Sequence, residues 1–269
     1  MRGLSRASLA EVEERFNGVA GAADLGTLAD ELFAVADLFD REHGLRRSLS
    51  DPSVPAAQKA QAARVLLDGK VSPATVSTVE SAVGAKWSRA GDLPDVLERL
   101  GVVAACAEAE SQSRLDDVED ELFRFGRIVA ASPDLRRALT GPSLPAEGKR
   151  ALLNELIGGK VAPSTLRLLA QLVTHSRGRS LDGGLEEFGG LAAEQRQRLV
   201  AVVRSAIALS EEHKQRLAAW LRASFGRDVH LNVEVDPRVL GGFSIRIGDE
   251  IIDTSIAGRI EEVRRRLAG

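Results

Sequence analysis

The chain has 269 residues, of which 44% are apolar and 28% are charged, so it is long enough for one large domain or for two or three smaller ones. Its formal net charge of -3 provides no global positive field for nucleic acid or an anionic membrane surface. The single cysteine, Cys106, excludes an internal disulfide bond and a multi-cysteine metal site. No apolar run approaches the ~20 residues of a membrane helix, and residues 1–9 lack a signal peptide's apolar core. We therefore expect an intracellular protein without direct membrane insertion.

The first two thirds of the chain contain an internal repeat at an offset of ninety residues. Residues Leu45–Thr75 reappear without a gap as Leu135–Thr165. Upstream, Glu31 to Phe33 align with Glu121 to Phe123. Both copies carry apolar residues at helical spacing, and Pro and Gly residues separate the short helices. The repeat predicts tandem helical-bundle units, a first copy over residues 1–105 and a second, duplicated copy over residues 106–190.

Each copy also contains a Gly-Lys pair, at residues 69–70 and 159–160. A phosphate-binding loop has the spacing G-x-x-x-x-G-K-[ST], in which backbone amides and the Lys hold the phosphates. Arg64 and Asn154 stand at the positions of the first glycine, and a valine follows each Lys where a hydroxyl is needed. This pattern favours the end of a helix over a nucleotide site.

The pattern changes after residue 190, and we expect a compact portion to begin between Gly184 and Leu199. The expected elements are a strand within residues 198–209, a helix over residues 211–225, strands over residues 229–235 and 243–247, a hairpin turn at residues 248–249 toward residues 251–252, and a last helix after Ser255. In order these are strand, helix, strand, strand and helix. Residues 191–269 are thus predicted to form a small α/β domain, in a chain that is mainly α.

Two sets of motifs resemble a known family. The far end of the chain reads V-D-x-x-[IL]-G-G, an alternating strand, G-D and then D-x-S before a Leu- and Arg-rich helix. The helical copies share the spacing L-x-x-x-L-x-x-P-x-x-x-x-x-x-K, from Leu45 to Lys59 and from Leu135 to Lys149. On these motifs the chain resembles the delta subunits of bacterial F-type ATP synthases, homologues of the oligomycin-sensitivity-conferring protein, in a long form with a duplicated helical domain. The structural positions of the family motif are Asp236, Gly241, Gly242, Gly248, Asp253 and Ser255.

The resemblance implies a non-catalytic stator subunit that couples proton transport to ATP synthesis. The helical region would bind amino-terminal segments of the alpha subunits, and the α/β domain would bind the b subunit. The complex would place the chain at the cell membrane, as a peripheral protein on the cytoplasmic side, with no cofactor and no nucleic acid. The candidate b-subunit interface is the apolar face of the last helix, formed by Ile256, Ile260, Val263 and Leu267.

The residues themselves provide no constellation for catalysis or for metal binding. The four histidines are scattered and are expected at the surface: His43, His175, His213 and His230. Asp236 and Asp253 fit turns better than an acid/base pair, and Ser205 and Ser255 lack a paired His and Asp. Cys106 is expected to be a small buried hydrophobe.

Some alternatives remain open at this stage. Residues 264–266 are three arginines at the end of the last predicted helix, where they form either a solvated face or a site for an acidic partner. For the whole chain, the alternatives are a helical adaptor unrelated to ATP synthase and a phosphate- or nucleotide-binding enzyme built on the α/β domain.

Overall fold

The structure is a computed structural model of the chain. It describes residues 3–197, 199–207, 209–225, 229–236, 243–247 and 250–253. Its contacts divide the chain into two compact units, Met1–Gln195 and Arg196–Gly269. The division falls between Gly184 and Leu199, where the residue pattern changes.

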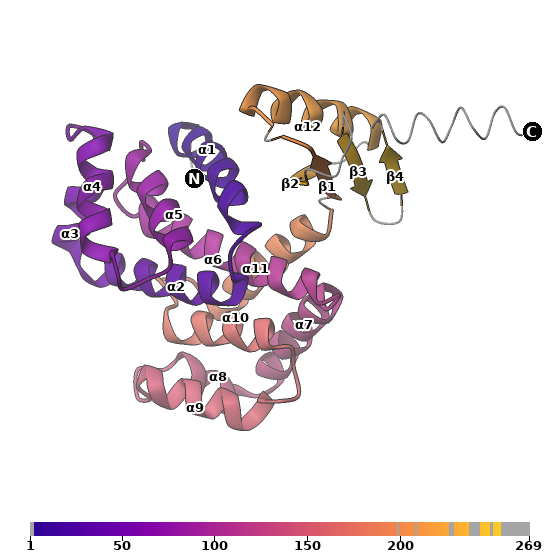
Figure 1. The fold of residues 1–269 in the computed structure, drawn as a ribbon. Coiled ribbons are helices and arrows are strands. Elements are labelled where there is room, and N and C mark those ends of the chain that lie inside the picture. The colour runs from indigo at the N-terminus through magenta and orange to yellow at the C-terminus, as the bar shows by residue number, and fades with distance from the viewer. Residues whose placement is uncertain are drawn as a thin grey trace, which may run out of the picture. The chain divides into compact units, whose positions relative to one another are not determined.

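The described part of the first unit consists of helices α1 to α11 (Figure 1). Their bounds are α1 Gly3–Ala20, α2 Leu25–Arg41, α3 His43–Ser50, α4 Ala56–Leu67, α5 Pro73–Gly84, α6 Asp92–Ser111, α7 Leu115–Ala131, α8 Pro133–Thr140, α9 Ala146–Ile157, α10 Pro163–Thr174 and α11 Leu181–Gln197. Helices α2 to α5 recur as α7 to α10, and every bound is displaced by ninety residues. The predicted tandem helical units are therefore confirmed.

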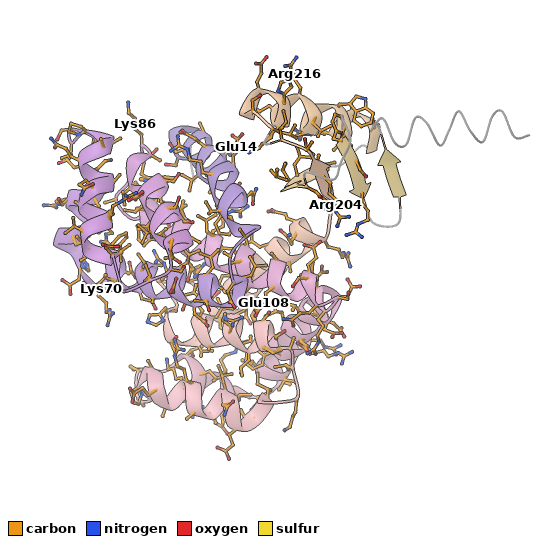
Figure 2. The ribbon with its side chains drawn as sticks, viewed as in Figure 1. Glu14, Lys70, Lys86, Glu108, Arg204 and Arg216 are labelled. Carbon is orange, nitrogen blue, oxygen red and sulfur yellow. The ribbon has the colours of Figure 1, made fainter. Side chains whose placement is uncertain are left out.

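The same local signals end and start the helices of both copies. Gly69 and Gly159 follow α4 and α9 with φ angles of +69° and +70°, a conformation that residues with a Cβ rarely adopt. The ammonium groups of Lys70 (Figure 2) and Lys160 donate to the carbonyl oxygen four residues earlier, at 2.8 and 2.9 Å. Both Gly-Lys pairs therefore have the geometry of a helix C-terminal cap.

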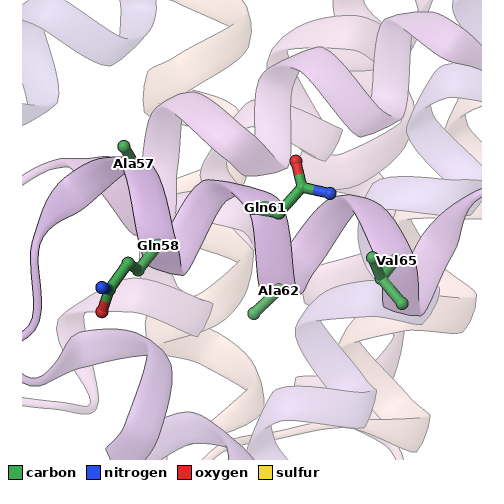
Figure 3. Close-up of a pocket in the computed structure, with 5 residues that line it drawn as sticks. All are labelled: Ala57, Gln58, Gln61, Ala62 and Val65. Atoms are coloured by element: carbon green, nitrogen blue, oxygen red, sulfur yellow. The ribbon is translucent and has the colours of Figure 1, made fainter.

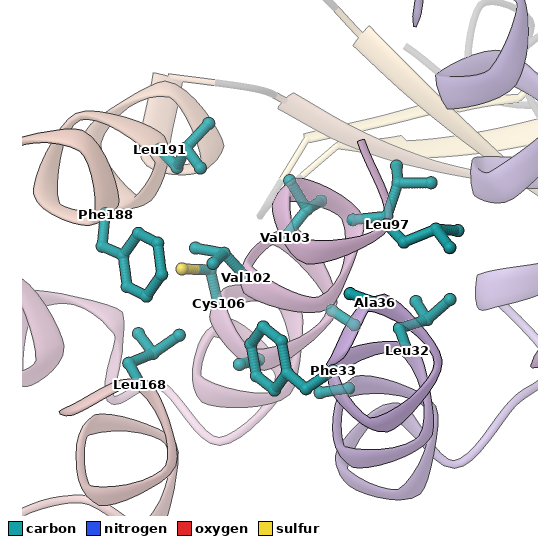
Figure 4. Packing of buried hydrophobic residues seen from close by; sticks show 14 of the residues in the cluster. Leu32, Phe33, Ala36, Leu97, Val102, Val103, Cys106, Leu168, Phe188 and Leu191 are labelled. Atoms are coloured by element: carbon teal, nitrogen blue, oxygen red, sulfur yellow. The ribbon is translucent and has the colours of Figure 1, made fainter. Parts of the chain in front are cut away.

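Helix α6 lies at the centre of the helical unit and contacts α1, α2, α5, α7 and α10. In the second copy, α6 takes the place that α1 has in the first copy, and it is also the sixth helix of the first copy. The predicted boundary between residues 105 and 106 would therefore fall inside α6. The two copies share one cluster of buried apolar residues (Figure 4). A Cβ atom on Gly101 would lie 2.7 Å from the ring of Phe33, so the close approach of α2 and α6 depends on this glycine. The division into domains 1–105, 106–190 and 191–269 stays a prediction.

The second unit contains β1 (Leu199–Ser205), α12 (Glu211–Phe225), β2 (Val229–Val235), β3 (Phe243–Ile247) and β4 (Glu250–Asp253). The sheet order is β2-β1-β3-β4. β1 is parallel to β2 and antiparallel to β3, and β3 is antiparallel to β4. A parallel pair needs a crossover connection, and α12 lies within it. The mainly α fold with a small α/β part is confirmed.

The described residues of the second unit share one cluster of buried apolar side chains. The fully buried side chains of Val203 on β1, Ile245 on β3 and Leu221 on α12 pack together. Among the described residues there are four strands, one more than the predicted order contains. The extra strand is β4. The sequence analysis predicted a turn toward residues 251–252 but did not count these two apolar residues as a strand.

Candidate functional site

Most of the residues predicted from the family motif lie outside the described residues. This holds for the proposed b-subunit face, Ile256, Ile260, Val263 and Leu267, for the arginines 264–266, and for Gly241, Gly242, Gly248 and Ser255. Asp236 follows β2, and its amide donates to the carbonyl of Ser205 at 2.9 Å. Asp253 ends β4 opposite Ser244. The roles of all these positions stay predictions.

The described residues contain no group of three or more His, Cys, Asp or Glu side chains arranged to bind a metal ion. Cys106 is completely buried on α6, as expected, and burial raises the pKa of its thiol to about 12. Within the described part of the chain, no helix combines the length and hydropathy needed to cross a membrane.

A cluster of charged side chains joins the segment after α10 to α6 of the first copy. Arg179 contacts Glu98 at 2.6 Å, and Arg177 contacts Asp95 at 2.7 Å. Only 2% of Glu98 is exposed, and burial raises the pKa of its carboxyl despite the two arginines. Arg177 has a φ angle of +52°, an uncommon conformation for a residue with a side chain. The cluster therefore holds the α10–α11 connection in one defined position.

The cluster continues onto α2 through Asp37. Its carboxylate accepts a hydrogen bond from Gln171 of α10 at 3.2 Å and lies 3.1 Å from Nδ1 of His175. Burial raises the pKa of Asp37 and lowers that of His175, because each charge is partly removed from water. The expectation of a surface position is wrong for His175, which is half-buried because the second copy packs against α2. Because Asp37 on α2 contacts both Gln171 of α10 and His175, the polar cluster fixes the two copies together.

Two glutamates hold equivalent positions in the two copies. Glu31 on α2 accepts hydrogen bonds from the amide of Ser72 at 2.9 Å and from the hydroxyl of Thr75 at 2.6 Å. Glu121 makes the same contacts ninety residues later, to the amide of Ala162 at 2.9 Å and to the equivalent threonine. Burial opposes ionisation of Glu31, but the hydrogen bonds outweigh it and lower the pKa. Each glutamate therefore ties the start of α5 or α10 to its own bundle.

The sequence did not predict that these two glutamates contact the starts of α5 and α10. The two glutamates align in the repeat, and so do the two threonines. A glutamate and a threonine that recur in both copies among apolar residues could therefore have indicated the contact. The charged cluster had no such signal, because its members come from α2, α6, α10 and the segment after α10.

The outer face of α4 forms a shallow hollow without charged side chains (Figure 3). It is lined by Ala57, Gln58, Gln61, Ala62 and Val65. Val65 is 70% exposed. In the second copy, the residues equivalent to Ala57 and Val65 are Glu147 and Glu155. The first copy thus presents an uncharged helix face that the second copy lacks, and such a face suits an amphipathic partner helix.

The second unit also exposes large apolar side chains. Ile207, Trp220 and Val235 are 73%, 50% and 55% exposed. Exposed aromatic residues are enriched at protein interfaces, where one ring supplies a large contact area. Both units therefore present surfaces of the kind that bind other proteins.

Comparison with known proteins supports one family. A family model described as ATP synthase delta (OSCP) subunit matches residues 102–267, from within α6 into the second unit. An ATP synthase subunit delta of Thermobifida fusca (strain YX) is 51% identical over 269 residues, 100% of both chains. One of Streptomyces griseus subsp. griseus is 48% identical over 271 residues, again with 100% of both chains.

One solved structure is also similar. A chain of the cryo-EM structure of the Toxoplasma gondii mitochondrial ATP synthase hexamer is 20% identical, with 62% of this chain and 95% of that chain covered and a TM-score of 0.27, a score too low to bear on the arrangement of this chain. The family model covers more than half of the residues, and the two bacterial relatives align over the whole length, first copy included. The chain therefore belongs to the ATP synthase delta (OSCP) subunit family.

Proposed function

We propose that this chain fastens the catalytic alpha/beta head of an F-type ATP synthase to the b subunit of the peripheral stalk and so couples proton transport to ATP synthesis. The chain is a structural, non-catalytic subunit of the synthase, as its family is, and is not an unrelated helical adaptor. The observation that carries the proposal is the 51% identity over the full length to an ATP synthase subunit delta.

The helical unit binds amino-terminal segments of the alpha subunits in this proposal. The uncharged face of α4 supports this role, because an amphipathic helix can lay its apolar side against such a face. The buried polar cluster supports it as well, because a stator must transmit force without letting its parts slide, and the cluster links the two helical copies through α2, α6 and α10.

The α/β unit binds the b subunit in this proposal. Its exposed Trp220 supplies one apolar contact area, and the predicted helix face of Ile256, Ile260, Val263 and Leu267 is the second candidate. The synthase is a membrane-associated complex, and we place this chain on its cytoplasmic side as a peripheral subunit.

Co-purification tests the proposal directly. An affinity tag on the full chain, expressed in its own host, should recover alpha, beta and b subunits after mild detergent extraction. A tagged Val65→Glu chain tests the helical contact, and a tagged Trp220→Glu chain tests the α/β contact. Each should weaken recovery of one partner more than of the other. Recovery of none of the three subunits by the unmodified chain would contradict the proposed function.

A further inference from the structure

Helices α2 and α7 are equivalent in the repeat, yet one surface stripe differs between them. On α2 the stripe consists of Gly26, Asp30, Phe33, Asp37 and Asp40, spaced along one helix face. Ninety residues later, the α7 stripe consists of Asp116, Asp120, Phe123, Arg127 and Ala130. Phe33 is 5% exposed, whereas Phe123 is 65% exposed. Two identical side chains at equivalent positions therefore have opposite environments.

The second copy is docked on the α2 stripe, in which Gly26, Phe33 and Asp37 are buried while the side chain of Asp30 is 63% exposed. Arg167 of α10 lies 2.8 Å from Asp30, and His175 lies 3.1 Å from Asp37. Phe33 lies in the core that these helices share (Figure 4). The stripe is thus the surface through which one copy accepts the basic residues of the next.

The α7 stripe stands at the corresponding place on the second copy, where the described helices include no third copy to fill it. Head-to-tail packing of repeats always leaves one such surface at the end of the array. Within the described helical unit, Phe123, Arg127 and Ala130 are all exposed. An exposed phenylalanine at a position built for docking indicates a surface that is covered in the working assembly.

The charges on the α7 stripe argue against a second copy of this chain as the occupant. Asp37 is replaced by Arg127, and Asp40 by Ala130. A segment like the one after α10 would bring His175 and Arg177 to positions where their acidic partners are missing. Like charges across an interface disfavour a wrong partner strongly. At the end of the stripe where His175 and Arg177 would dock, a basic and a small residue have therefore replaced two acidic ones, while Asp120 keeps the charge of Asp30.

We propose that the α7 stripe binds an amphipathic helix of another ATP synthase subunit, which places a small residue over Phe123 and a carboxylate opposite Arg127. The small residue follows from the first copy, where Gly101 of α6 lies against the ring of Phe33. The carboxylate follows from the charge of Arg127. This inference rests on the proposed function, since it assigns the partner helix to the same complex.

The chain permits a test with one reactive thiol, because Cys106 is completely buried and its pKa is about 12. The thiol of Phe123→Cys should react with a maleimide at least about tenfold more slowly in the purified synthase than in the isolated chain. The matched control is Asp134→Cys on α8, whose native side chain is 92% exposed and which should react equally in both. Equal reaction of Phe123→Cys in a synthase that contains the chain would overturn the inference. A chain absent from the synthase would instead contradict the proposed function.

A thiol-linked photo-cross-linker at Phe123→Cys then identifies the occupant. A cross-link to an acidic helix of another synthase subunit supports the proposal. A cross-link to a second copy of this chain, or to residues 196–269 of the same chain, overturns it. In the Phe123→Cys background, Arg127→Glu should abolish the protection from maleimide, and Arg127→Lys should retain it. Protection that survives Arg127→Glu would overturn the assigned carboxylate.

Discussion

The two helical copies share their internal contacts and differ in their surface residues. Inside each copy, a glutamate ties the start of the fifth helix to the second, and a glycine with positive φ ends the fourth. Outside, the α4 face is uncharged where α9 carries Glu147 and Glu155, and Phe33 is buried where Phe123 is exposed. Contacts within a bundle depend only on the bundle, so both copies retain them. Surfaces depend on what each copy touches, so their differences point to different partners.

The largest effect is expected where the two copies meet. Glu98→Ala removes the buried carboxylate between Arg177 and Arg179 and should lower the free energy of unfolding by about 3–5 kcal/mol, because it breaks a buried ion pair. Urea unfolding followed by circular dichroism measures it. The control is Glu187→Ala, which contacts the same Arg179 at 2.8 Å but is 48% exposed, and which should cost at most about 1 kcal/mol. Equal effects of the two variants would show that burial of the cluster does not add to the stability of the fold.

A smaller effect is expected from filling the contact between α2 and α6. Gly101→Val places a side chain against the ring of Phe33 and should cost about 3 kcal/mol through overpacking. Gly18→Ala in α1 is the control, because no atom outside its own helix lies within 4 Å of the added Cβ, and it should be neutral or stabilise by up to about 1 kcal/mol. Thermal unfolding distinguishes the two. A fully stable Gly101→Val chain would mean that α2 and α6 can separate at little cost.

The shared glutamates provide a sharper comparison of the copies. Glu31→Ala and Glu121→Ala should each cost about 1–2 kcal/mol at pH 7, since each removes the carboxylate that accepts hydrogen bonds at the start of α5 or α10. The pKa of Glu31 is lowered in the folded chain, so its contribution is present above its ordinary pKa near 4.5 and is lost as the pH falls through the folded value. The difference in unfolding free energy between the unmodified chain and Glu31→Ala should therefore narrow in acid. A difference that grows in acid would contradict the assigned role of the carboxylate.

The smallest effect on stability is expected on the outer face of α4. Val65→Glu gives the first copy the residue that the second copy has, and it should change the free energy of unfolding by less than about 0.5 kcal/mol. If α4 binds the head, the same variant should weaken binding of the alpha subunits by about tenfold, because it places a charge in an apolar contact. Pull-down from the purified complex measures this. Glu155→Gln on α9 is the control and should bind as the unmodified chain does.

Part of the architecture followed from local patterns. Apolar spacing, Pro and Gly predicted the helices, and the exact repeat of element bounds explains why the duplication was visible in the residues. Alternation and turn residues predicted the strands around Val233 and Ile245, but β4 was not counted, because four residues carry too weak an alternation. The candidate site was predicted less well. The charged cluster of Glu98, His175 and Arg177 joins residues far apart in the chain, so no local pattern indicated it.

The sequence by itself determined the tandem helical copies, the smaller α/β part and the family, because each depends on local periodicity or on a contiguous motif. Only the tertiary structure decided which of two identical residues at equivalent positions is buried. Phe33 and Phe123 follow the same Glu-Leu pair on equivalent helices, yet one is buried and the other exposed. The reason is physical: Phe33 is covered by another helix, α6, whose Gly101 lies against its ring, whereas the described helical unit leaves Phe123 65% exposed.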